Sequence, residues 1–229
     1  MKITLSILGS TGSVGLTVLK ILNKQKNIFK INLLSANKNF KAISRQIKIY
    51  KPKYFIINND LVYKKIQKKF KNKNIKILRN FSYIKSIKKS DITIAAIPGI
   101  AGLQPTLKMI KNTKKLLIAN KESIICGWSL IKKLSQKFRT KIIPIDSEHF
   151  SIFKIIKDHN IENIEKIYIT ASGGPFLRFK PYQFKKITPT DALKHPKWKM
   201  GKKITVDSST LMNKLFEIIE AQKLFSVPI

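Results

Sequence analysis

Short apolar strands alternate with helical patterns through residues 1–145, and this alternation restricts the fold more than any other feature of the chain. Val14, Val18 and Leu22, for example, recur at helical spacing directly after an apolar run at residues 3–8. Such alternation is typical of a parallel sheet with helices on both faces. The sequence therefore predicts an α/β fold with a doubly wound parallel sheet. Its expected strands cover residues 3–8, 31–34, 54–57, 75–78, 92–96, 116–119 and 142–145, and its first two helices cover 14–22 and 40–49.

The turn after the first strand carries glycine at positions 9, 12 and 15. Glycine lets the backbone turn tightly and approach a ligand closely, and the free N–H groups of the following helix favour an anion. Because this turn follows a strand and opens a helix, it predicts a dinucleotide site in a Rossmann-like domain. An ordinary glycine-rich turn is the alternative.

The end of the second strand distinguishes between the two nicotinamide cofactors. Sites for NAD usually place an acid there, to bind the ribose 2′-hydroxyl. Residues 35–39 contain no acid and instead offer Asn37, Lys38 and Asn39, which suit a 2′-phosphate. The sequence thus favours NADP, although lysine is so common in this chain that Lys38 says less than the missing acid.

Two carboxylates follow the last of these strands, at Asp146 and Glu148. In an extended segment their side chains would point to the same side, where their like charges would repel. A hard divalent metal would remove this conflict, and Glu217 could complete its ligand set. The alternative is a solvated turn that carries two acids.

Polar groups follow two further expected strands. Asn120, Lys121 and Glu122 lie where open α/β sheets bind ligands, although Asn120 would also serve as a helix cap. Ser172 follows a strand expected at residues 164–170 and precedes two glycines, so it could bind an anion, or it could belong to a plain turn.

A long helix is expected to begin at Asp207 or Ser208 and to end near Phe225. Its spacing predicts an apolar core stripe of Leu211, Leu215, Ile218 and Ile219, with Asn213, Lys214, Glu217 and Glu220 on another side. Before it, His195, Trp198 and Met200 lie on a segment bounded by proline and glycine. That segment suits a lid over a substrate, and a tryptophan in the core is the alternative.

The charge balance is strongly basic, with 46 Lys+Arg against 12 Asp+Glu and a formal net charge of +34. Only four of the basic residues are arginine, and lysines recur along the whole chain, as in a composition that has drifted toward lysine, isoleucine and asparagine. Proteins that read nucleic acid usually cluster their basic residues and rely on arginine. We therefore expect no specific nucleic-acid binding, but non-specific attraction to polyanions.

Several features are those expected of a protein in a reducing compartment. Cys126 is the only cysteine, which fits a reducing compartment, and no apolar run has the length of a membrane span. Met1 and Lys2 lead straight into a strand, so we expect no signal peptide.

Six motifs together resemble the 1-deoxy-D-xylulose 5-phosphate reductoisomerase family, in the order in which that family has them. They are GSTGSVG at 9–15, ANKES at 119–123, PIDSEH at 144–149, ASGGPF at 171–176, HPKWKMG at 195–201 and VDSSTLMNK at 206–214. The resemblance implies NADPH-dependent conversion of 1-deoxy-D-xylulose 5-phosphate, a phosphorylated small molecule, to 2-C-methyl-D-erythritol 4-phosphate in isoprenoid biosynthesis. It also implies a cytoplasmic homodimer with one Mg²⁺, Mn²⁺ or Co²⁺ ion.

The resemblance further implies a role for each residue that matches a family motif. The metal ligands would be Asp146, Glu148 and Glu217, and the catalytic residues Lys121, Glu148 and His195. The lid would include His195, Trp198 and Met200. The NADPH site would contain Thr11, Gly12, Ser13, Val14, Lys38, Asn39, Asn120 and Glu122. The substrate site would contain Lys121, Ser147, Glu148, Ser172, His195, Ser208, Asn213, Lys214 and Glu217.

Two departures from the family pattern are visible. Asn37 stands where the family often has glycine, and the chain stops at Ile229 although family members are much longer. We therefore expect an NADPH-binding domain at 1–145 and a truncated, incomplete α+β catalytic domain at 146–229, and poor or no catalysis by the chain alone. The alternatives are an inactive remnant that only binds NADPH, or a basic protein that binds polyanions without specificity.

Overall fold

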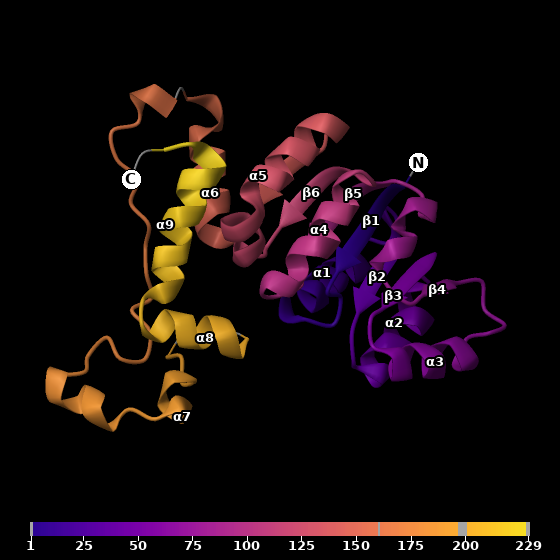
Figure 1. Cartoon of the computed structure of the whole chain (residues 1–229), viewed down its shortest axis with the longest axis horizontal. Helices are drawn as coiled ribbons and strands as arrows, with labels where there is room; N and C mark the ends of the chain where they lie inside the picture. The colour runs from indigo at the N-terminus through magenta and orange to yellow at the C-terminus, as the bar shows by residue number, and fades with distance from the viewer. Residues whose placement is uncertain (1, 160, 197–200, 228–229) are drawn as a thin grey trace. The chain divides into compact units, whose positions relative to one another are not determined.

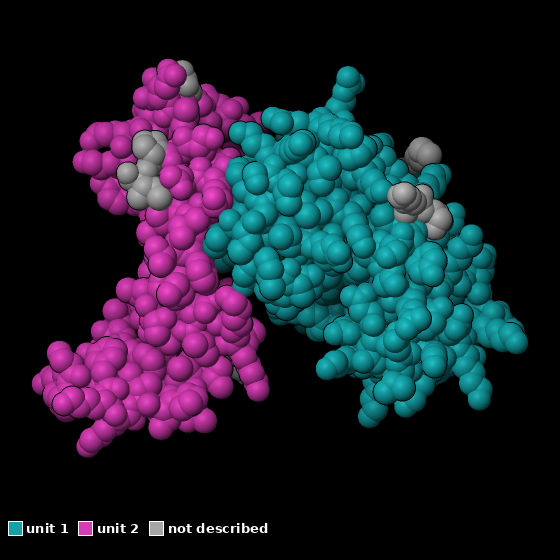
Figure 2. Space-filling view, in the orientation of Figure 1, with its two compact units in different colours: residues 1–146 teal, residues 147–229 magenta. Residues whose placement is uncertain are grey.

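The computed structural model describes residues 2–159, 161–196 and 201–227. It divides into two compact units, residues 1–146 and residues 147–229, which Figure 2 colours separately.

The first unit is built on a sheet of seven strands that are all parallel, in the order β4-β3-β2-β1-β5-β6-β7. This confirms the expected Rossmann-like α/β fold, and every strand expected before residue 146 is present. The strands are β1 (Ile3–Leu8), β2 (Phe29–Ala36), β3 (Tyr54–Ile57), β4 (Lys76–Leu78), β5 (Ser90–Ala95), β6 (Thr113–Ile118) and β7 (Lys141–Pro144).

Helices connect these strands, as the parallel arrangement requires (Figure 1). Ile7, Leu34 and Phe55 of the central strands are fully buried, and they belong to one apolar core with Leu19 and Ile43. The helices are α1 (Ser13–Lys24), α2 (Phe40–Tyr50), α3 (Asp60–Lys69), α4 (Leu103–Ile110) and α5 (Lys121–Phe138), with 3-10 helices at Phe81–Ser86 and Ile100–Gly102.

The strand order reverses at β1. From β1 the chain runs outward through β2 and β3 to β4, and it then returns to place β5 on the other side of β1. Ligands of open α/β sheets bind beyond the carboxyl ends of the strands at such a reversal. The turn after β1 therefore lies where the fold itself creates a crevice.

Asp91 joins three adjacent strands of the sheet. Its Oδ2 accepts hydrogen bonds from the backbone N of Thr4 at 2.8 Å and from Thr4 Oγ1 at 2.7 Å, and its Oδ1 lies 2.8 Å from Nζ of Lys114. Lys114 and the two Thr4 donors hold the pKa of Asp91 well below its usual range. The charged form of Asp91 thus stabilises the pairing of β1, β5 and β6.

We predict that Asp91→Asn lowers the free energy of unfolding by about 1.5 kcal/mol at neutral pH, because it removes charge-assisted hydrogen bonds. Since the pKa is lowered in the folded state, this contribution is complete above about pH 4 and is lost as the pH falls toward the folded pKa. Urea unfolding of wild type and variant at pH 7 and pH 3 measures the effect. The difference in free energy of unfolding between wild type and Asp91→Asn should be smaller at pH 3 than at pH 7. The exposed control Asp158→Asn should unfold with the same free energy as wild type. A difference between wild type and Asp91→Asn that does not change with pH would contradict the assignment.

The second unit is helical in its described residues, which contain no strand. The strand expected at residues 164–170 is therefore not formed. An extended segment becomes a strand only when its N–H and C=O groups pair with a neighbour, and no described strand of this unit lies beside it. The helices are α6 (Ser147–Ile155), α7 (Pro189–Ala192), α8 (Lys202–Ser209) and α9 (Met212–Phe225), with 3-10 helices at Ile156–Asp158, Ile161–Asn163 and Pro181–Lys186.

No helix in the described part of the chain combines the length and apolar character that crossing a bilayer requires.

The expected long helix is in fact two helices, so the expected cap at Asp207 or Ser208 is wrong: both residues lie inside α8. The break falls at Leu211, whose φ of 60° is left-handed, while the expected end at Phe225 is confirmed. The expected core stripe is also wrong, because Leu211, Leu215 and Ile218 are 40 to 55% exposed. α9 instead packs its acidic side inward, toward α6.

We predict that Leu211→Gly stabilises the chain by about 1 kcal/mol, because a left-handed conformation costs a residue with a Cβ roughly that amount. Leu211 is 55% exposed, so little packing is lost. Thermal unfolding of the variant should show a higher midpoint. The matched control is Thr210→Gly, whose φ of −112° needs no glycine and which should lower the midpoint. Equal effects of the two changes would mean that the backbone at Leu211 is not strained.

Candidate functional site

The glycine turn after β1 lies against the end of β5. Gly9 has a φ of +84°, and a Cβ at this position would lie 2.7 Å from the carbonyl oxygen of Ala96. Only glycine satisfies both the conformation and the close approach. The N–H groups of Gly9 and Ser10 donate to the carbonyl oxygen of Ser35 at 3.1 and 2.8 Å, so the turn is also fastened to β2.

A buried glutamine holds the same turn from the side of α2. Gln46 accepts a hydrogen bond from Ser10 Oγ at 2.7 Å and donates one to the carbonyl oxygen of Ser10 at 2.8 Å. Neither Gln46 nor Ser35 was predicted from the sequence. The available signal was a polar residue on the apolar stripe of α2, between Ile43 and Ile47, because a buried amide needs a partner.

The amino-terminal end of α1 is open. Gly12 precedes the helix and supplies no side-chain cap, and a Cβ at Gly12 would meet no protein atom closer than 3.4 Å. Thr11 is half-buried beside it, while Ser13 and Val14 are exposed. The first N–H groups of α1 can therefore receive an anion from outside the protein.

The end of β2 presents the polar groups expected from the sequence. Asn37, Lys38 and Asn39 are exposed, and Asn39 caps α2 by accepting a hydrogen bond from the N–H of Ala42 at 3.0 Å. No carboxylate occurs between residues 35 and 39. The local charge is therefore positive where an NAD site would be negative.

Asn120 is the expected cap of α5, and its Oδ1 accepts from the N–H of Ser123 at 2.6 Å. Its Nδ2 donates to the carbonyl oxygens of Ile97 at 2.6 Å and Gly99 at 2.9 Å. Asn120 therefore ties the turn after β6 to the turn after β5. The half-buried Lys121 and Glu122 follow in the first turn of α5.

The backbone at Asp146 and Glu148 is not extended. Asp146 lies in a bend, and Glu148 lies in the first turn of α6. The expectation that an extended segment points both carboxylates to one side is therefore wrong. The helix begins directly after the strand, as is usual for a βα turn, and Ser147 is exposed at its first position.

Within the second unit, Lys214 brings together two acids that the sequence singled out. Its Nζ lies 3.7 Å from Glu148 Oε1 and forms an ion pair with Glu217 Oε2, and it also donates to the carbonyl oxygen of Thr170. Asn213 Nδ2 donates to Glu217 Oε1 at 2.7 Å. The side chain of Glu217 is 1% exposed and that of Glu148 is 29% exposed, so one acid is enclosed and the other opens toward solvent.

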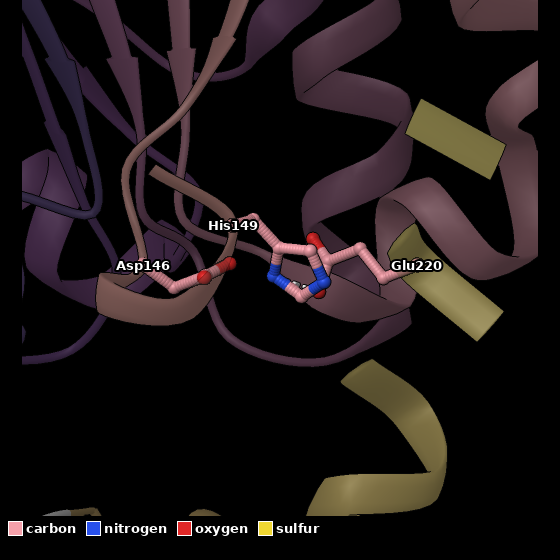
Figure 3. Close-up of side chains that lie close together, drawn as sticks. All are labelled: Asp146, His149 and Glu220. Carbon is pink, nitrogen blue, oxygen red and sulfur yellow. Dashed lines mark ion pairs between the residues drawn. The ribbon is translucent and has the colours of Figure 1, made fainter. Parts of the chain in front are cut away.

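A histidine and a second buried acid lie behind this group. His149 is fully buried; its Nε2 lies 2.8 Å from the carbonyl oxygen of Glu217, and its Nδ1 lies 3.4 Å from Glu220 Oε2 (Figure 3). Asp146, which directly precedes α6, forms with His149 and Glu220 a group of possible metal ligands whose ligand atoms lie within 4.8 Å of one another. No role of His149 was predicted from the sequence.

Ser172 and His195 meet although 23 residues separate them, with Ser172 Oγ 3.0 Å from His195 Nε2. The loop of Ser172 can approach α8 because Gly174 has no Cβ. Its φ is +65°, and a Cβ there would lie 2.4 Å from the carbonyl oxygen of Ser208. Ser208 Oγ donates to the carbonyl oxygen of Thr205 at 2.9 Å. Trp198 and Met200, expected in the lid, lie outside the described residues.

Comparison with protein families gives two matches that together span most of the chain. The model of 1-deoxy-D-xylulose 5-phosphate reductoisomerase matches residues 5–127, and the model of the C-terminal domain of the same enzyme matches residues 142–225.

Individual relatives carry the same name. The chain is 49% identical over 227 residues to the 1-deoxy-D-xylulose 5-phosphate reductoisomerase of Pelagibacter ubique, and 42% identical over 228 residues to that of Clostridium novyi. The first alignment covers 97% of this chain and 58% of the relative, and the second 96% and 59%. The chain thus spans little more than half the length of these relatives.

Two solved structures are similar to the whole chain. The Zymomonas mobilis reductoisomerase in complex with NADPH has a TM-score of 0.89 and 33% identity, with 100% of this chain and 59% of that chain covered. A reductoisomerase in complex with NADPH, fosmidomycin and magnesium has a TM-score of 0.89 and 33% identity, with 98% and 59% covered.

Proposed function

The chain belongs to the 1-deoxy-D-xylulose 5-phosphate reductoisomerase family, and we propose on this premise that it carries the cofactor, metal and substrate groups for converting 1-deoxy-D-xylulose 5-phosphate to 2-C-methyl-D-erythritol 4-phosphate. The observation that carries the proposal is the family match on both segments, 5–127 and 142–225. We further propose that the protein acts in the cytoplasm as a homodimer.

The first unit fits NADPH. The open end of α1 beyond Gly12 suits the pyrophosphate, because uncapped N–H groups and the helix dipole favour an anion. Thr11, Ser13 and Val14 would line that end, and Lys38 and Asn39 would hold the 2′-phosphate. Asn120 uses its amide on backbone partners, so its role would be to fix the turn that carries Glu122.

The second unit fits a divalent cation. Glu148 and Glu217 both face the ammonium of Lys214, so a positive charge already stands between two carboxylates. A hard cation with oxygen ligands would neutralise the same pair, and Asp146, directly before α6, would be the third ligand. Lys214 would then be released toward the substrate.

The phosphate of the substrate would be held by side chains that donate hydrogen bonds without carrying negative charge. Ser172, Ser208, Asn213 and Lys214 meet this requirement. His195, already 3.0 Å from Ser172, would close over the phosphate together with the rest of the lid. Ser147 and Lys121 would contact the remainder of the substrate.

When bound, the metal supplies Lewis-acid polarisation of the ketone and hydroxyl oxygens, and NADPH supplies the hydride. The protein's own groups do the rest. Glu148 and Glu217 would hold the metal, Lys121 and Glu148 would serve in proton transfer, and His195 would help to keep water out. The carbon rearrangement would proceed by retro-aldol and aldol steps.

A second function rests on charge alone. The net charge of +34 attracts polyanions, and this attraction needs no specific site. Binding of this kind falls steeply with salt and has no sequence preference, whereas NADPH binding by the turn after β1 would distinguish related cofactors.

We predict that the chain binds NADPH more tightly than NADH, and that Lys38→Asp reduces or reverses this preference by at least about tenfold, or about 1.4 kcal/mol. Removing a positive group and adding a negative one should affect only the cofactor with the 2′-phosphate. Fluorescence titration with both cofactors measures the change. Lys30→Asp, an equal charge change at the other end of β2, is the matched control and should leave the preference intact; tighter binding of NADH by wild type would refute the assignment.

We predict that Glu148→Gln and Glu217→Gln each weaken Mn²⁺ binding by at least about tenfold, because each removes an anionic oxygen ligand. Calorimetry with Mn²⁺ measures this, with the exposed Glu165→Gln as control. NADPH oxidation with 1-deoxy-D-xylulose 5-phosphate then tests the function itself. We expect at most slow oxidation by this chain alone. That oxidation should require both Mn²⁺ and the substrate and should be lost in Glu217→Gln; oxidation that persists without metal would contradict the proposal.

A further inference from the structure

The structure assigns a positioning role to Glu220 and His149: Glu220 fixes the His149 imidazole, and the imidazole fixes Glu217 relative to Glu148. The contacts of this pair stand independently, whereas its consequence for metal binding rests on the proposed function. Both residues are buried, with His149 at 0% and Glu220 at 1% exposure.

The partner of Nε2 decides which ring nitrogen of His149 carries a hydrogen. A carbonyl oxygen only accepts hydrogen bonds, so His149 Nε2 carries the hydrogen and donates it to Glu217 at 2.8 Å. The other ring nitrogen, Nδ1, then faces Glu220 Oε2 at 3.4 Å. Phe225 lies parallel to the ring, with centroids 6.3 Å apart and an interplanar angle of 22°. Figure 3 shows the imidazole beside the Glu220 side chain.

The pair acts on the two acids through the backbone. His149 directly follows Glu148 on α6, and it bonds to the carbonyl oxygen of Glu217 on α9. One hydrogen bond therefore joins the two helices at the positions of the two acids. Rotation of the ring would break this hydrogen bond and remove the link that holds Glu217 relative to Glu148.

Glu220 is placed to act on the ring. It lies one helical turn after Glu217, on the same inward side of α9, where a carboxylate is costly to bury. Its Oε2 is directed at His149, while Lys214 pairs with Glu148 and Glu217. Groups that orient a ligand from behind commonly change metal affinity by about 10- to 100-fold when they are removed.

The test compares Glu220→Ala, Glu220→Gln and the exposed control Glu165→Ala, all in the 229-residue chain. The first readout is the imidazole Nε2–H signal in proton–nitrogen NMR, which the chain's three histidines make assignable. The second is Mn²⁺ affinity by calorimetry. We expect a slowly exchanging Nε2–H in wild type, in Glu165→Ala and in Glu220→Gln, whose amide keeps a polar partner of the same size beside Nδ1.

Glu220→Ala should lose that signal and should weaken Mn²⁺ binding by about 10- to 100-fold, while Glu220→Gln stays within about threefold of wild type. If Glu220→Ala does not unfold cooperatively, Glu220→Asp replaces it, because it withdraws the carboxylate by one methylene and should show the same loss.

Three results would overturn the inference: no protected Nε2–H in wild type, a protected signal that survives in Glu220→Ala or Glu220→Asp, or a loss in Glu220→Gln as large as in Glu220→Ala. A wild-type chain that binds no Mn²⁺ would refute the proposed metal site instead. The NMR readout would then still decide whether Glu220 orients the ring.

Discussion

Two carboxylates lie inside the second unit, and the need to compensate them organises the helices around them. Glu217 and Glu220 are each 1% exposed, and a buried carboxylate persists only where cations or hydrogen-bond donors replace water. Lys214 forms an ion pair with Glu217, and Asn213 donates a hydrogen bond to it. His149 Nδ1 lies 3.4 Å from Glu220 Oε2. Because these partners come from α6 and from α9 itself, the two helices must meet on the acidic side of α9. Leu215 and Ile218 of α9 are left exposed as a consequence.

The first unit follows a different constraint, the parallel pairing of β1 with both β2 and β5. This pairing brings the turn after β1 against Ala96 and fixes it to Ser35, which explains why Gly9 cannot carry a side chain. The turn is therefore rigid before any ligand arrives. A preorganised turn loses little entropy when it binds an anion, which suits it to hold a cofactor.

The sequence predicted the first unit well because its signals are local. Each strand is a short apolar run, and the cap Asn120 can be recognised from its immediate neighbours. The second unit was predicted less well because its structure depends on distant partners. The periodicity of α9 indicated Leu211, Leu215 and Ile218 as the core, yet the partners of Glu217 and Glu220 decided which side turned inward. The segment 164–170 has strand-like residues but lacks a described neighbour with which to pair. Likewise, residues 146–148 could not reveal that the helix begins directly after the bend at Asp146.

The few acids of this basic chain indicate structural roles more clearly than its many lysines do. With 12 acids against 46 bases, an acid on an ordinary surface gains only weak and diffuse attraction. Four of the acids do something more definite. Asp91 joins three strands, Asp191 closes a capping box with Thr188, and Glu217 and Glu220 hold α9 in place. A compositional drift toward lysine can replace acids that only face solvent. Replacing an acid that accepts hydrogen bonds from specific donors would leave those donors unpaired. These four acids therefore mark positions where charge is part of the structure. Two of them, Glu217 and Glu220, lie on the helix pair that also carries the proposed metal ligands Glu148 and Glu217.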